Sequence, residues 1–145
     1  MRTKNVEVLI PLSRKLITTI IKKGTQLTES IAQVLKEENI TTQQFNVLRI
    51  LRGRHGEPAN LQDVSKDMLH SNSNTTRVVD KLVSKNLVER VQCPGDRRQI
   101  ELTITEDGLA LLSRLDHKVD EIEQSLTAAL TEDEIEMLIT KLNKL

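Results

Sequence analysis

The apolar residues of this chain recur every three or four positions almost throughout, and the period changes to two in one short stretch only. Alternation within that stretch predicts two strands, Leu87–Cys93 and Gln99–Thr105. The sequence Pro94-Gly95-Asp96 between them is typical of a tight turn. Because the longer period elsewhere predicts helices, the sequence predicts a mainly α fold with one small two-stranded β-hairpin.

The predicted helices divide the chain of 145 residues into three regions around that hairpin. Region 1–36 holds a long helix from Val6 to about Lys36, with an apolar stripe made of Leu9, Leu12, Leu16, Ile20, Leu27, Ile31 and Val34. Region 37–105 holds shorter helices and the hairpin. Region 106–145 holds a second long helix with an apolar stripe from Leu109 to Leu130, and then a last short helix.

The two apolar stripes need more cover than a single small chain offers. Two copies that pack these helices together would bury both stripes, so regions 1–36 and 106–145 are predicted to be dimerisation helices. The alternative is that the stripes pack on each other within one chain.

Polar side chains mark where several helices begin or end. Thr41–Gln44 has the spacing of a capping box, and Thr131–Glu134 repeats it before the last helix. Asn60 and Thr105 are predicted N-caps. Asn86 is predicted to end its helix in the left-handed conformation that asparagine tolerates.

Charge is distributed unevenly, although the chain carries 21 basic and 21 acidic residues. Between Ser71 and Arg98 there are six basic and three acidic residues, whereas region 106–145 has four basic and ten acidic ones. A DNA-binding protein must be basic at its binding surface and need not be basic overall. The basic segment 71–98 is therefore the part of the chain that suits a DNA-binding surface.

Aromatic residues and cysteines are too few for several classes of function. Phe45 is the only aromatic residue, which argues against single-strand or RNA binding by base stacking. Cys93 is the only cysteine, which excludes an internal disulfide and a cysteine-based zinc site. The sequence shows neither a membrane-spanning apolar run nor a signal peptide, so we expect a cytoplasmic protein without a membrane partner.

Sequence patterns of enzymes are also missing. No paired-carboxylate site, glycine-rich phosphate loop or Ser–His–Asp pattern can be placed, and the three histidines have no metal-ligand spacing. We therefore expect no enzymatic activity, no metal and no cofactor. Cys93 leaves a thiol-based redox-sensing regulator as an alternative, because nearby Arg90, Arg97 and Arg98 favour a thiolate.

The most informative element is the helix predicted from about Asn72 to Lys85. It turns Val78, Val79, Leu82 and Val83 inward, and short polar side chains crowd its start. The predicted DNA-binding residues there are Ser71, Ser73, Asn74, Thr75, Thr76, Arg77 and Lys81. Such a helix start in the major groove offers hydrogen bonds to base edges, and the alternative is that these residues only cap the helix.

The turn of the hairpin supplies a second candidate contact. Arg97 and Arg98 lie on a narrow tip beside the predicted recognition helix, where inserted arginines are attracted to a narrow minor groove. Asp96 is predicted to stabilise this tip as a side-chain clamp. A solvated charged turn is the alternative for the Asp-Arg-Arg sequence taken alone.

Taken in order, these segments resemble the MarR family of multiple antibiotic resistance regulators. The matching segments are Thr76–Val83, Leu87–Arg90, Asp96–Arg98 and Leu102–Gly108. Asn86 stands where many members have glycine, and the wing is short.

The resemblance implies a winged helix-turn-helix homodimer that regulates transcription, most often as a repressor, on a pseudo-palindromic operator. Residues 73–77 would face the major groove, Arg97 would be the wing-tip residue, and Arg98 would pair with Asp96 or enter the minor groove. In many relatives a small-molecule effector releases the DNA, and Arg14, Lys15, His55 and His117 are polar candidates near such a site. A winged-helix module for protein contacts is the remaining alternative.

Overall fold

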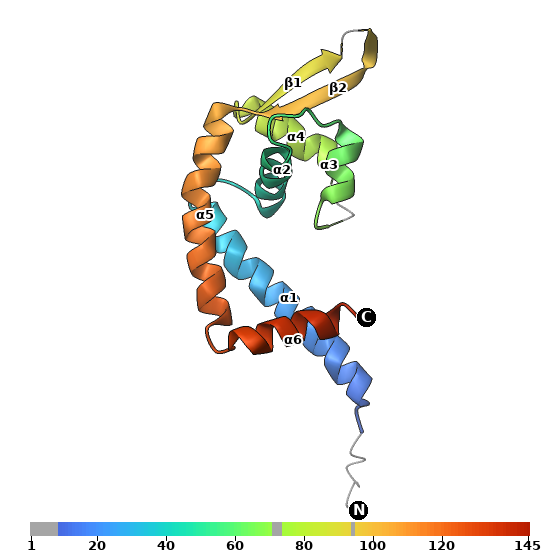
Figure 1. Cartoon of the computed structure of the whole chain (residues 1–145), viewed down its shortest axis with the longest axis vertical. Helices are drawn as coiled ribbons and strands as arrows, with labels where there is room; N and C mark the ends of the chain where they lie inside the picture. The colour runs from blue at the N-terminus through green and yellow to red at the C-terminus, as the bar shows by residue number, and fades with distance from the viewer. Residues whose placement is uncertain (1–8, 71–73, 94) are drawn as a thin grey trace, which may run out of the picture.

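The structure is a computed structural model, and it describes residues 9–70, 74–93 and 95–145. Within these ranges the chain forms six helices and two strands (Figure 1): α1 (Leu12–Lys36), α2 (Thr42–Gly53), α3 (Leu61–Asp67), α4 (Thr75–Ser84), β1 (Val88–Cys93), β2 (Asp96–Ile104), α5 (Glu106–Thr127) and α6 (Glu132–Leu142). This arrangement confirms the mainly α fold with one antiparallel hairpin.

Two helices begin later than the sequence predicts. Helix α1 begins at Leu12, because Pro11 occupies its N-cap with ψ 144°, and a residue before proline, here Ile10, disfavours helical backbone. Helix α4 begins at Thr75 and not near Asn72, with Asn74 as its N-cap. The predicted helical residues 6–8 and 72–73 lie outside the described ranges.

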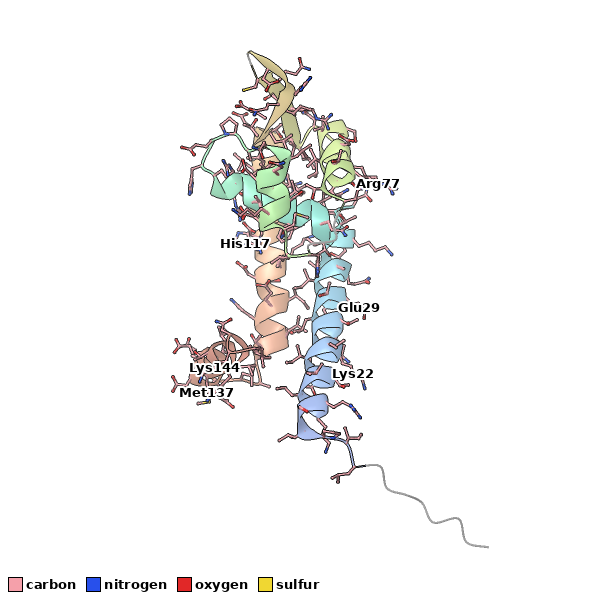
Figure 2. All side chains as sticks on the ribbon, turned by 90° about the vertical axis from the view of Figure 1, so that its right-hand side faces the viewer. Lys22, Glu29, Arg77, His117, Met137 and Lys144 are labelled. Atoms are coloured by element: carbon pink, nitrogen blue, oxygen red, sulfur yellow. The ribbon has the colours of Figure 1, made fainter. Side chains whose placement is uncertain are left out.

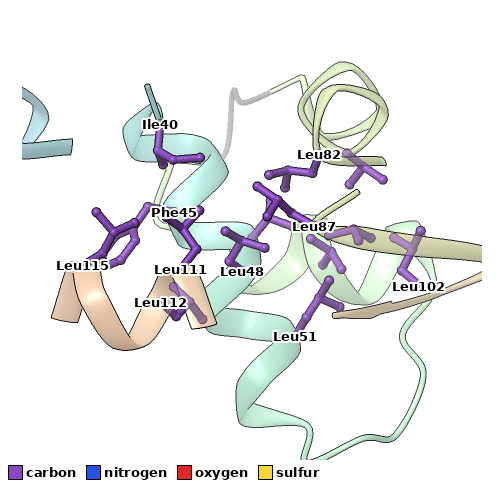
Figure 3. Close-up of a cluster of buried hydrophobic side chains, with 14 of the residues drawn as sticks. Ile40, Phe45, Leu48, Leu51, Leu82, Leu87, Leu102, Leu111, Leu112 and Leu115 are labelled. Atoms are coloured by element: carbon purple, nitrogen blue, oxygen red, sulfur yellow. The ribbon is translucent and has the colours of Figure 1, made fainter. Parts of the chain in front are cut away.

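All buried side chains of the described residues lie between residues 31 and 119, and we call this part the lobe. Its core joins α2, α4, the hairpin and the first half of α5 (Figure 3). The fully buried side chains are Leu35, Val47, Leu48, Val64, Val79, Leu82, Val88, Leu102, Leu112, Leu115 and Val119. Leu35 and the three residues from α5 show that both long helices contribute to this core.

The hairpin is held to the rest of the lobe by backbone hydrogen bonds. Strands β1 and β2 pair with Val88 opposite Ile104, and the register becomes irregular at Cys93. Leu102 of β2 exchanges two further hydrogen bonds with Ala59, at 3.0 and 2.7 Å. The loop between α2 and α3 therefore fixes the base of the wing.

The predicted capping residues and the predicted left-handed asparagine are confirmed. Capping boxes form at Thr41–Gln44 and Thr131–Glu134, with both reciprocal hydrogen bonds present. Asn60 and Thr105 cap α3 and α5. Asn86 has φ 60°, the left-handed conformation that places the chain on course for β1.

The junction between the hairpin and α5 is closely packed at Gly108, in the first turn of α5. A Cβ atom at this position would lie 2.4 Å from the Leu87 carbonyl oxygen and 2.7 Å from Ile104 Cγ1. Only glycine allows this approach without a shift of the backbone.

The rest of the described chain, residues 9–30 and 120–145, contains no buried side chain, and we call it the leg. Large apolar side chains are exposed on α1 (Leu12, Leu16, Ile17, Ile21 and Leu27) and on α6 (Met137, Leu138, Ile139 and Leu142). Figure 1 shows α6 turning from the end of α5 and crossing α1 in that view, and Figure 2 shows that the two helices are separated there. No helix in the described residues is long and apolar enough to cross a membrane.

Candidate nucleic-acid interface

Helix α4 has one buried and one exposed side. Val79 and Leu82 are fully buried, and Val78 and Val83 are half-buried against the core. The exposed side carries four of the predicted DNA-binding residues, Asn74, Thr76, Arg77 and Lys81. Figure 2 shows Arg77 on the outer side of the lobe. The predicted contacts Ser71 and Ser73 lie outside the described residues.

Asn74 has a structural task at the start of this helix. Its side-chain oxygen accepts a hydrogen bond from the Arg77 backbone N–H at 3.2 Å. The side-chain amide nitrogen keeps its donors, so capping and contact with an acceptor on DNA are compatible.

Thr75 does not lie on the exposed side, contrary to the expectation that it faces DNA. It is 6% exposed, and its Oγ1 accepts a hydrogen bond from Ser65 Oγ at 2.8 Å. Residues 75, 79 and 82 share one helix face, so Thr75 points inward with Val79 and Leu82. The polar residue thereby ties α3 to α4.

The tip of the wing is held by Asp96. Its Oδ1 accepts a hydrogen bond from the Arg98 backbone N–H at 3.0 Å, so the carboxylate clamps the turn through the main chain. The Arg98 side chain is exposed and, in the described part of the chain, forms no ion pair with Asp96. The Arg97 side chain lies outside the described part.

An ion pair missed in the sequence analysis connects the wing to α4. The guanidinium Nη2 of Arg90 on β1 contacts Asp80 Oδ1 on α4. Sequence gives no signal for this pair, because the two residues become neighbours only when β1 folds back beside α4. The pair links the wing to the helix.

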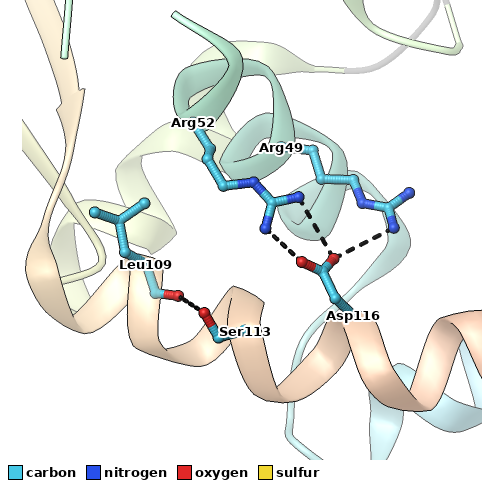
Figure 4. Close-up of polar contacts among 5 residues, drawn as sticks. All are labelled: Arg49, Arg52, Leu109, Ser113 and Asp116. Carbon is cyan, nitrogen blue, oxygen red and sulfur yellow. Dashed lines mark hydrogen bonds and ion pairs between the residues drawn. The ribbon is translucent and has the colours of Figure 1, made fainter. Parts of the chain in front are cut away.

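A second missed cluster joins α5 to α2 (Figure 4). Asp116 on α5 contacts Arg52 Nη1 at 2.5 Å and Arg49 Nη2 at 3.4 Å, and Arg49 stacks 4.3 Å from the centre of the Phe45 ring. Desolvation is the largest influence on the pKa of Asp116 and raises it, but the hydrogen bonds and charges of Arg52 and Arg49 together lower it.

The described neighbours of Cys93 disfavour its thiolate form. Its Sγ lies 3.4 Å from Glu101 Oε1, and this hydrogen bond, partial burial and the charges of Glu101 and Asp96 raise the pKa of the thiol. The described neighbours therefore act against the thiolate that was expected, because the charges among them that act on the sulfur are the carboxylates of Glu101 and Asp96.

Metal-binding geometry is not found in this region. Among the described residues, no group of three or more histidine, cysteine, aspartate or glutamate side chains is arranged to hold a metal ion.

The sequence of the chain is similar to those of known regulatory proteins. The MarR family model matches residues 40–100. The multiple antibiotic resistance protein MarR of Escherichia coli is 33% identical over 138 residues, which cover 94% of this chain and 91% of that protein. The HTH-type transcriptional regulator MhqR of Bacillus subtilis is 30% identical over 134 residues, which cover 91% and 90% of the two chains.

A solved structure extends the similarity to three dimensions. A mutant form of E. coli MarR, crystallised in complex with operator DNA, superposes with a TM-score of 0.75 at 30% identity, over 98% of each chain. Its polypeptide therefore has the same order of long helix, winged lobe and long helix. With the exposed polar side of α4 beside a clamped wing, these similarities show that the chain belongs to the MarR family of DNA-binding transcriptional regulators.

Proposed function

We propose that this protein binds a specific double-stranded operator as a homodimer and represses transcription from it. The observation that carries the proposal is the exposed side of α4, where Asn74, Thr76, Arg77 and Lys81 stand beside the wing. Short polar side chains and an arginine at a helix start suit base edges in the major groove.

The wing supplies the second proposed contact. Arg98 is exposed next to a turn that Asp96 clamps, and Arg97 precedes it in β2. Arginine side chains at such a tip suit the negative potential of a narrow minor groove. Because Asp80 and Arg90 fix the wing to α4, both elements would meet DNA in one orientation.

The leg supports the proposed dimer. Leu12, Ile17 and Ile21 of α1 are 82%, 56% and 63% exposed, and α6 has no buried residue at all. Large apolar side chains exposed in such number are typical of a protein interface. A second copy that covers it with the same surface would complete a two-fold dimer.

A small-molecule effector is part of the proposal. A cleft of about 400 Å³ opens between α1 and the start of α2, and Ala32 and Ile40 give it apolar walls while His70 gives it a polar edge. This volume suits a compact organic ligand. Arg14, Lys15, His55 and His117 do not line this cleft.

The experiment that tests the proposal is selection of bound duplexes from a random DNA pool at two salt concentrations. We expect a pseudo-palindrome with half-sites about one helical turn apart. The Arg97→Ala/Arg98→Ala variant is expected to bind the selected DNA more weakly, with a salt slope lower by roughly one for each phosphate-contacting charge removed.

Three results of that selection contradict parts of the proposal. An unchanged salt slope removes the wing from DNA binding. A selected site without two-fold symmetry removes the dimeric arrangement. Failure to select any sequence makes a winged-helix module for protein contacts the better explanation of the exposed α4 surface.

A further inference from the structure

A groove runs between the start of α2 and the exposed side of α4. It consists of two adjoining hollows of about 450 and 280 Å³, which share Thr41, Gln44 and Lys81. We call it the α2–α4 groove. The lining residues that matter here are Lys36, Thr41, Gln44, Arg77, Lys81 and Lys85. Lys36 belongs to α1, so three helices meet at this groove.

The groove carries uncompensated positive charge. Four of its lining side chains are basic and, in the described part of the chain, none is a carboxylate. The nearby carboxylates are engaged elsewhere, since Glu38 contacts Lys118 at 3.2 Å and Asp80 contacts Arg90. In a chain with equal numbers of basic and acidic residues, this separation creates a local site for an anion.

Hydrogen-bond donors gather on the same surface. Gln44 is 4% exposed, and its Oε1 accepts from the Thr41 N–H at 3.1 Å and from Lys85 Nζ at 3.4 Å. Its Nε2 has no acceptor among the described residues, and neither does the first-turn N–H group of Gln43, which also lines the groove. The groove thus offers several hydrogen-bond donors, which suit a ligand that only accepts hydrogen bonds.

We infer that the α2–α4 groove binds a backbone phosphate of the operator, next to the bases that α4 contacts. This inference rests on the proposed function and extends its DNA contact to Lys36, Gln44 and Lys85. A phosphate diester is an acceptor-only anion, which matches both the charge and the donors. Arg77 and Lys81 belong both to the exposed side of α4 and to the groove, so one DNA strand passes from the helix into it.

Lys36 gives the sharpest test, because it lines the groove and makes no ion pair within the described residues. The variant is Lys36→Gln in the full-length protein, with the selected operator duplex as ligand. The matched control is Lys22→Gln, which changes an exposed lysine of the same helix far from the groove (Figure 2). Dissociation constants are measured over a range of salt concentrations.

We expect Lys36→Gln to lower the salt slope by about 0.9, which corresponds to about eightfold weaker binding at 0.1 M salt. Lys22→Gln is expected to leave both quantities unchanged. Neutral methylphosphonate linkages are then placed one at a time in the duplex. At the contacted position, Lys36→Gln is expected to cause no further loss.

Different failures separate the inference from the function on which it rests. If the wild type selects no DNA, the proposed function fails and the inference fails with it. If the wild type binds its operator but Lys36→Gln keeps the full salt slope, only the inference fails. Stabilisation by inorganic phosphate that requires Lys36, with an unchanged DNA salt slope, assigns the groove to free phosphate and also overturns the inference.

Discussion

The lobe and the leg are built from similar amphipathic helices, but the apolar side chains are buried in the lobe and exposed in the leg. In the lobe, α2, α4 and the hairpin enclose side chains such as Leu48 and Leu102, which are fully buried within one chain. In the leg, Leu16 and Ile139 are 47% and 55% exposed. The contrast shows that one chain encloses the core of the lobe, whereas the leg leaves its apolar side chains exposed, and we propose that a second copy covers them.

The largest expected effect comes from a deletion in the lobe core. Leu48→Ala is expected to lower the free energy of unfolding by about 2–5 kcal/mol, because it leaves a cavity among fully buried neighbours. Urea denaturation at several protein concentrations measures this loss. The matched leg variant is Leu16→Ala, whose cost is expected to depend on protein concentration if the proposed dimer buries this side chain between two copies. If the loss of unfolding free energy in Leu16→Ala did not depend on protein concentration, Leu16 would not be buried between copies and the contrast between leg and lobe would fail.

Two glycine substitutions compare the lobe and the leg again, with smaller expected changes in the free energy of unfolding. Gly108→Ala is expected to destabilise the protein by about 1–3 kcal/mol, since the added methyl group meets the Leu87 carbonyl oxygen. Gly24→Ala in the leg has nothing within 4 Å of the new atom and is expected to stabilise α1 by up to about 1 kcal/mol. Thermal unfolding of both variants measures the pair. If both substitutions lowered the unfolding temperature, α1 would be packed at Gly24 as tightly as α5 is at Gly108.

The smallest expected effect concerns Asp116, which joins α5 to α2. Asp116→Asn is expected to cost on the order of 1 kcal/mol at pH 7, because its partners Arg49 and Arg52 are more than a third exposed and water screens the pairs.

The pH dependence of that cost has a definite sign. The pKa of Asp116 is lower in the folded than in the unfolded chain, so its contribution is present above the unfolded value near pH 4 and is lost as the pH falls through the folded value. Urea denaturation at decreasing pH should show wild type and Asp116→Asn converging. A constant difference down to about pH 2 would exclude the carboxylate charge as the cause.

Local sequence signals were sufficient for most of the fold. The capping boxes at Thr41 and Thr131 and the left-handed Asn86 are all encoded within a few residues, and the structure has each of them. At Thr75, helical periodicity predicts burial of the side chain correctly, whereas its polarity does not. It lies four positions before Val79 and seven before Leu82, which places it on the buried face.

The sequence could not show contacts that depend on how distant segments come together. Asp116 lies more than sixty positions from Arg49 and Arg52, and nothing near any of the three indicates the others. The same holds for the α2–α4 groove, where α1, α2 and α4 each contribute residues. The effect of Glu101 on Cys93 could not be predicted either, because Glu101 becomes its neighbour only when the two strands pair.

The direct passage from β2 into α5, with only Thr105 between them, has a mechanical consequence. The 22 residues of α5 form a rod of about 33 Å that is wedged to the lobe at Gly108 and ends in the leg. A tilt of about 5° at one end of such a rod moves the other end by about 3 Å. That displacement is close to the spacing of about 3.4 Å between successive base pairs. A small change of angle at the leg end of α5 would therefore become a displacement of the lobe comparable to one base-pair step.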